Sequence, residues 1–115
     1  MSLKIANIVL DTPDAARSAT FWAAALDWQV SDWSDPSEAA VRNPDGGSAL
    51  YFMRVPEGKT VKNRLHLDLE PSGSTQAEIE RLVGLGAQRV RSFESHTVML
   101  DPDGNEFCVT GDPNS

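Results

Sequence analysis

An internal repeat is the feature of this sequence that most constrains its fold. Residues 43–47 (Asn-Pro-Asp-Gly-Gly) recur as residues 101–105 (Asp-Pro-Asp-Gly-Asn), at an offset of 101 − 43 = 58. Upstream, residues 4–10 align with residues 63–69 at an offset of 66 − 7 = 59. Because two unrelated segments share one period to within a residue, we expect two modules with the same fold. Each repeated turn has a proline for its first corner and a glycine for a left-handed position.

Each module is predicted to contain a strand, a helix and three further strands. The modules span about 1–58 and 59–115, are joined by the turn-rich connector 56–60, and form a single domain over residues 1–115, because the chain is too short for two independent cores. The helices are expected to begin at Thr12 and Thr75, which resemble N-caps, and the second to end at Gly84 and Gly86. The predicted strands are 4–10, 29–33, 39–42 and 48–55 in the first module, and 63–69, 88–93, 97–100 and 106–110 in the second. The tail 111–115 is expected to be loose.

Alternation along the predicted strands sorts their side chains into two faces. Leu65, Leu67 and Leu69 are expected to pack beneath a helix, so that His66 and Asp68 point the other way. In the first strand, Asn7 is opposite the apolar Ile8 and Leu10. Leu50 and Phe52 share a face, as do Glu106 and Cys108. We expect these two faces to join those of Asn7 and His66 in lining one concave surface.

Charge and composition exclude several classes of partner. Ten basic and seventeen acidic residues give a formal net charge of −7 without a basic segment, which disfavours binding to nucleic acid or to an anionic membrane. The single cysteine, Cys108, excludes an intrachain disulfide. No apolar run approaches the ~20 residues that cross a bilayer, and no signal peptide is evident, so we expect a cytoplasmic protein that acts on a small molecule or on another protein.

These features together resemble one known superfamily. Two βαβββ modules, the helix segment 21–26 (Phe-Trp-Ala-Ala-Ala-Leu), the strand around His66 and the segment 101–108 (Asp-Pro-Asp-Gly-Asn-Glu-Phe-Cys) resemble the vicinal-oxygen-chelate superfamily of glyoxalase I, bleomycin-resistance proteins and extradiol dioxygenases, and especially its small glyoxalase-like domains. The resemblance implies an α+β fold with a pseudo-twofold axis, in which curved mixed sheets form a cleft between the modules. It also implies a homodimer.

The resemblance also bears on metal binding. Catalytic members bind a divalent metal through one residue on each of four strands, and the matching positions here are Asn7, Leu50, His66 and Cys108. His66 alone fits that pattern, because Leu50 has no donor atom and Asn7 offers only a weak amide oxygen. We therefore expect no metal and no other cofactor. A shifted site that uses His66, Glu106 and waters remains an alternative.

Two functional classes stay open. The first is a metal-independent protein that binds an unidentified small molecule in the cleft. The residues expected to line its site are Asn7, Trp33, Leu50, Phe52, His66, Glu106 and Cys108. The second is an enzyme, either a metal-dependent lyase or dioxygenase with a shifted site or a metal-free acid–base catalyst that uses His66 and Glu106. An apolar pocket would suit Glu106 for that role by raising its pKa, whereas a simpler interpretation pairs His66 with Asp68 or Glu106.

Overall fold

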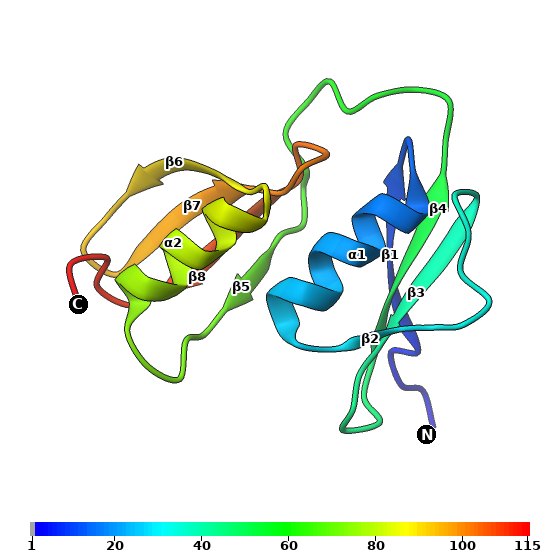
Figure 1. Ribbon diagram of the computed structural model, residues 1–115, viewed down its shortest axis with the longest axis horizontal. Helices are drawn as coiled ribbons and strands as arrows, with labels where there is room; N and C mark the ends of the chain where they lie inside the picture. Colours follow the sequence, from blue (N-terminus) through cyan, green and yellow to red (C-terminus); the bar gives the residue numbers. More distant parts are fainter. Residues whose placement is uncertain (1) are drawn as a thin grey trace. The chain divides into compact units, whose positions relative to one another are not determined.

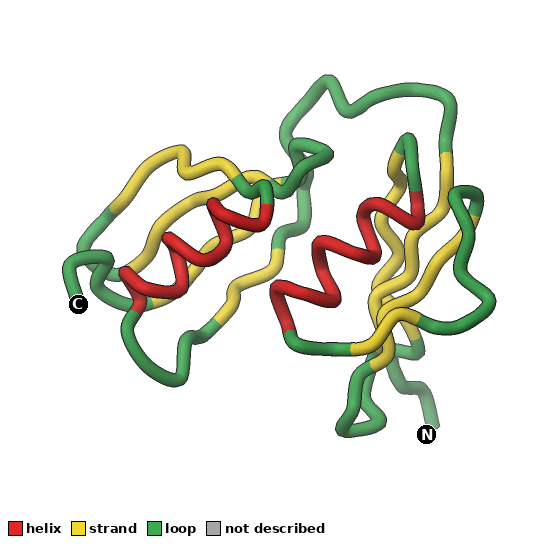
Figure 2. Tube along the Cα trace, viewed as in Figure 1, coloured by secondary structure: helices red, strands yellow, loops and turns green. Residues whose placement is uncertain are grey.

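The protein folds as two compact units, each with one helix and one four-stranded sheet. The computed structural model describes residues 2–115; the first unit ends at Gly58 and the second begins at Lys59. Figure 1 shows a helix along one face of each sheet, and Figure 2 shows the loops that join the elements. The predicted fold class, α+β with two βαβββ modules, is confirmed.

The two units have the same topology. The first contains β1 (Asn7–Thr12), α1 (Ala15–Leu26), β2 (Gln29–Val30), β3 (Glu38–Arg42) and β4 (Ala49–Arg54). The second contains β5 (Leu67–Leu69), α2 (Thr75–Leu85), β6 (Gln88–Ser92), β7 (His96–Leu100) and β8 (Glu106–Thr110). The strand orders are β1-β4-β3-β2 and β5-β8-β7-β6, and in each sheet the first pair is parallel and the others are antiparallel.

The repeated sequence segments form the same turn in both units. Gly46 and Gly104 adopt left-handed conformations with φ of 78° and 87°, which favour glycine. The backbone N–H of Gly46 donates to the carbonyl of Asn43 at 3.0 Å, and that of Gly104 donates to Asp101 at 2.9 Å. The side chains of Asn43 and Asp101 each accept the backbone N–H two residues later, at 2.9 Å in both turns. The predicted turn chemistry is confirmed.

Both helices begin near the expected positions but use different caps. The N-cap of α1 is Asp14, and that of α2 is Ser74, whose side chain accepts the N–H of Ala77. Thr12 is instead the last residue of β1, where its hydroxyl is buried 2.6 Å from that of Ser18. Thr75 is also buried and donates to the carbonyl of Thr110. Both threonines resembled caps because a cap is defined by backbone position, which side-chain type only suggests.

Each sheet turns one face toward its helix and leaves the other open. In the second unit Leu67, Phe107 and Met99 lie in register on the helix-facing side, as expected for Leu67. Strand β5 begins only at Leu67, and Leu65 is 71% exposed, so the expectation that Leu65 packs beneath the helix is wrong. With no strand partner, Leu65 is not held in the alternating pattern that would direct it inward.

In the first unit, the register reverses one prediction. Leu50 and Phe52 pair with Ile8 and Leu10 and are 3% and 1% exposed, on the side that packs against α1. They therefore do not share the open face with Asn7, as was expected. The sequence prediction was wrong because residues 50–53 are apolar on both faces of the strand. The alternation of side chains therefore did not indicate which face is buried.

The last residues are also better held than expected. The N–H of Gly111 donates to Ser95, the carbonyl of Ser115 accepts from Ser74, and Pro113 is buried. Residues 111–115 are thus fastened to the start of α2 rather than forming a loose tail. No helix within residues 2–115 is long and apolar enough to cross a membrane.

Candidate functional site

The open face of the second sheet brings together a histidine, a carboxylate and a thiol. Asp68 lies on β5 directly opposite Cys108 on β8, and His66 precedes β5 by one residue, on the same side as Asp68. Nε2 of His66 lies 3.1 Å from Oδ1 of Asp68. The candidate ligand atoms of these three residues are all within 4.8 Å of one another. We call this group the His66 cluster.

Asp68 is the centre of the His66 cluster because its carboxylate lies next to both other residues. It is opposite Cys108 in the β5–β8 pair, and its Oδ1 lies 3.1 Å from Nε2 of His66. A carboxylate beside Nε2 favours the tautomer with the proton on that nitrogen and leaves Nδ1 as a hydrogen-bond acceptor. The side chains of His66 and Asp68 are 44% and 60% exposed, so a ligand can reach both.

Cys108 is a poor nucleophile in this setting. Burial raises the pKa of the Cys108 thiol above its ordinary value, and the negative charge of Asp68 and the hydrogen bond to it raise this pKa further, against a smaller opposing effect of Lys62. The thiol is therefore protonated at neutral pH. Since the thiolate is the reactive and metal-binding form, Cys108 acts here as a hydrogen-bond donor and a buried apolar group.

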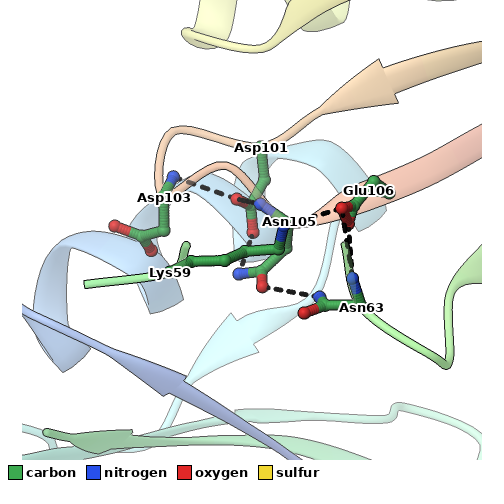
Figure 3. Close-up of polar contacts among 6 residues, drawn as sticks. All are labelled: Lys59, Asn63, Asp101, Asp103, Asn105 and Glu106. Atoms are coloured by element: carbon green, nitrogen blue, oxygen red, sulfur yellow. Dashed lines mark hydrogen bonds and ion pairs between the residues drawn. The ribbon is translucent and has the colours of Figure 1, made fainter. Parts of the chain in front are cut away.

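Glu106 belongs to a separate polar network, which holds the start of the second unit to β8 (Figure 3). Oε1 of Glu106 lies 2.7 Å from Nζ of Lys59. Both carboxylate oxygens of Glu106 accept the backbone N–H of Asn63, each at 3.2 Å. The side-chain amide of Asn63 donates to Asn105, whose own amide donates to Asp101. Glu106 therefore ties residues 59–63 to the turn that precedes β8.

These contacts contradict the expectation of a raised pKa at Glu106. Burial alone would raise the pKa of the Glu106 carboxyl, but the hydrogen bonds from Lys59 and from the backbone of Asn63 outweigh it and hold this pKa below its ordinary value. The side chain is 13% exposed, and its oxygens are already engaged by cationic and N–H donors. Glu106 is thus an ionised structural carboxylate and does not have the chemistry of a general acid.

We expect Glu106→Gln to destabilise the protein by about 1 kcal/mol at neutral pH, because the Lys59 ion pair is lost while an oxygen remains for Asn63. A carboxyl with a lowered folded-state pKa stabilises the fold above its unfolded pKa and loses this contribution as the pH falls through the folded value. The difference in the free energy of unfolding between wild type and Glu106→Gln should therefore become smaller below about pH 4. Urea unfolding at pH 7 and pH 3 measures it. A difference that grew at pH 3 would contradict this account.

The first unit supplies the other residues that were expected to line the site. Asn7 is exposed on the open face of β1, and Trp33 follows β2 and is 54% exposed. On β4 the residues that face the same side as Asn7 are Ala49, Tyr51 and Met53, and the hydroxyl of Tyr51 donates to Glu38 at 2.9 Å. Sequence reasoning missed Tyr51 because it lies between Leu50 and Phe52, which were assigned to the wrong face.

The four metal-binding positions that the resemblance assigned do not provide a ligand set. Leu50 is a hydrocarbon on the helix-facing side of its sheet, and Asn7 offers only a neutral amide. Burial and the charge of Asp68 raise the pKa of the Cys108 thiol, which disfavours the thiolate that a metal ion requires. His66 remains as a strong donor, and its Nε2 already faces Asp68. These residues do not fit the divalent metal of the catalytic members, which needs three or four deprotonated ligands.

Comparison with known protein families gives a match over nearly the whole chain. A family model described as a glyoxalase-like domain matches residues 7–110. Among curated proteins, no sequence matches the chain.

Solved structures of the same fold span the whole chain at low sequence identity. A possible glyoxalase from Bacillus cereus superposes with a TM-score of 0.75 at 18% identity, covering 95% of this chain and 99% of its own. The fosfomycin resistance protein FosX from Mesorhizobium loti gives 0.73 at 16% identity, with 96% and 92% covered. A bleomycin-binding protein from Streptomyces verticillus, in complex with copper(II)-bleomycin, gives 0.65 at 22% identity, with 96% and 98% covered. At these identities the structures show a shared fold.

Proposed function

Since the chain belongs to the glyoxalase-like domain family, we propose that it is a small-molecule-binding protein that recognises its ligand through His66 without a resident metal ion. The observation that carries this proposal is the His66 cluster, in which Asp68 orients the imidazole at 3.1 Å. A fixed imidazole with Nδ1 as acceptor, next to an exposed carboxylate, suits a ligand that donates hydrogen bonds.

The chemistry of the cluster favours binding over metal catalysis. Asp68 lies 3.1 Å from Nε2 of His66, and burial and the charge of Asp68 raise the pKa of the Cys108 thiol. Metal binding would require Cys108 to lose its proton and Asp68 to give up its contact with His66. One structural neighbour is described as a bleomycin-binding protein, which is a precedent for a binding role of this fold.

A second candidate function is metal-free acid–base catalysis, which the His66–Asp68 pair favours. A histidine that is oriented by a carboxylate resembles the arrangement in which imidazole accepts a proton from a substrate. In this alternative His66 touches the substrate, and Asp68 is a positioning residue. Glu106 does not take part, because its carboxylate is held by Lys59 and Asn63.

A ligand screen with two matched variants tests the proposal. A fragment library enriched in hydrogen-bond donors would be screened by ¹H–¹⁵N NMR, with amide shifts around β5 and β8 as the readout. We expect His66→Ala to weaken the binding of hits about tenfold or more. His96→Ala is the control, because His96 stacks on Phe93 at 4.8 Å and has no part in the His66 cluster. Hits that bind equally well to both variants would contradict the proposal, and turnover of a hit would favour the enzyme.

A further inference from the structure

A second group of exposed side chains lies on the open face of the first sheet. Val9 on β1 pairs with Tyr51 on β4, and Met53 is two residues further along the same strand. Trp33 approaches this surface from the loop after β2, with its ring centroid 5.6 Å from that of Tyr51 and a tilt of 37°. Val9, Trp33 and Met53 are 52%, 54% and 42% exposed. We call Val9, Trp33, Tyr51 and Met53 the aromatic platform.

The aromatic platform is a contiguous group of exposed apolar side chains. Single exposed apolar residues are normal on soluble proteins, but a contiguous group that includes two aromatic rings indicates a binding surface. The rings of Trp33 and Tyr51 present π faces, which attract flat molecules by stacking and cations by electrostatics.

One end of the aromatic platform is acidic. Met53 pairs with Asp11 on one side and with Glu38 on the other, so these two carboxylates flank it across about two strand spacings, or roughly 10 Å. Both residues are exposed. Glu38 also accepts the hydrogen bond from the hydroxyl of Tyr51, which places a negative charge at the edge of the Tyr51 ring.

One positive charge on this face, that of Arg42, lies toward the other end. Arg42 is four residues beyond Glu38 on β3, which corresponds to about 13 Å along a strand. Its guanidinium donates to the side-chain oxygen of Gln29 at 2.7 Å. The surface is therefore polarised, with carboxylates beside Met53 and the guanidinium held away from them.

We propose that the aromatic platform binds a flat organic cation, whose rings lie against Trp33 and Tyr51 and whose positive charge faces Glu38 and Asp11. The aromatic rings favour a flat ligand, and the two carboxylates favour one with a positive charge. An anion of the same shape is disfavoured by the same carboxylates. This site uses residues of the first unit and does not depend on the His66 cluster.

The test compares two planar dyes of opposite charge. Proflavine is a planar monocation at pH 7, and anthracene-9-carboxylate is a planar anion. Titrations in low-salt buffer, followed by dye fluorescence, are expected to show at least about tenfold tighter binding of proflavine. Trp33→Ala and Glu38→Gln should each weaken proflavine binding about fivefold, and Glu38→Gln retains an oxygen for the Tyr51 hydroxyl.

A matched control separates this site from non-specific attraction to an acidic protein. Glu80→Gln removes one exposed carboxylate from α2 and should leave proflavine binding unchanged. The proposal would be overturned if Glu38→Gln and Glu80→Gln lost proflavine affinity equally, or if the two dyes bound to the wild type equally tightly. Sedimentation that showed a dimer from which Trp33→Ala releases monomers, without dye binding, would assign the aromatic platform to a second copy instead. His66→Ala should bind proflavine like wild type, so failure of the proposed function leaves this result unaffected.

Discussion

Asp101→Ala is expected to destabilise the protein by about 2–4 kcal/mol, more than any other single change in the repeated turns. Asp101 is 4% exposed. It accepts the backbone N–H groups of Asp103 and Asn105 at 2.9 and 2.8 Å, and the side-chain amide of Asn105 at 3.1 Å. Alanine would leave these donors unpaired in a partly buried turn, and Asn105 could no longer hold Asn63 in place. Urea unfolding of the variant measures the loss.

The repeat supplies a control for this prediction. Asn43 is the equivalent residue of the first unit and makes the same turn contact, with Asp45. Its other side-chain bond, to the carbonyl of Ser48, is long at 3.4 Å. Asn43→Ala should therefore cost only about 1 kcal/mol. Equal losses in the two variants would show that the network around Asp101 adds nothing beyond the turn itself.

Gly111→Ala is expected to destabilise the protein by about 2–3 kcal/mol. Gly111 has a φ of 102°, which L-residues rarely adopt. A Cβ atom at this position would press against the hydroxyl of Thr75, which is buried and donates to Thr110. The change would therefore disturb both the end of β8 and the start of α2. Thermal unfolding of the variant should show a clearly lowered Tm.

The control for Gly111 is Gly58, where an added Cβ would meet nothing within 4 Å. Its φ lies outside the left-handed region, so Gly58→Ala should change the free energy of unfolding by less than about 0.5 kcal/mol. A Gly111→Ala variant as stable as Gly58→Ala would mean that the segment after β8 adjusts freely and is not fastened to α2.

The fold could be predicted from the sequence because the same pattern of turn and strand residues occurs twice in the chain. The turns at 43–47 and 101–105 fix where the last strand of each unit begins, and β8 starts at Glu106 as predicted. Side-chain faces were predicted well where one face is polar, as for His66 and Asp68. They were predicted wrongly for Leu50 and Phe52, where neighbouring residues on both faces are apolar.

The candidate site could be predicted only in part, because its chemistry depends on contacts between distant residues. The sequence indicated that Asp68 or Glu106 could pair with His66, and the structure selects Asp68 at 3.1 Å. It did not reveal that Lys59 and Asn63 engage Glu106, since they lie 47 and 43 residues away along the chain. No periodic sequence pattern predicts a contact between residues so far apart, which is why the lowered pKa of Glu106 could not be foreseen.

The central claim is that His66 serves ligand recognition, held by Asp68, without a metal ion. Its most direct test is the divalent-metal content of protein purified without chelator, then incubated with excess Zn²⁺, Mn²⁺, Ni²⁺ or Fe²⁺ and passed through gel filtration. The account predicts far less than one bound metal ion per chain for each of these ions, because a metal ion would have to displace the proton of the Cys108 thiol, whose pKa is raised, and break the contact between Asp68 and His66. Retention of about one equivalent, lost in both His66→Ala and Asp68→Asn, would contradict it and make the His66 cluster a metal centre.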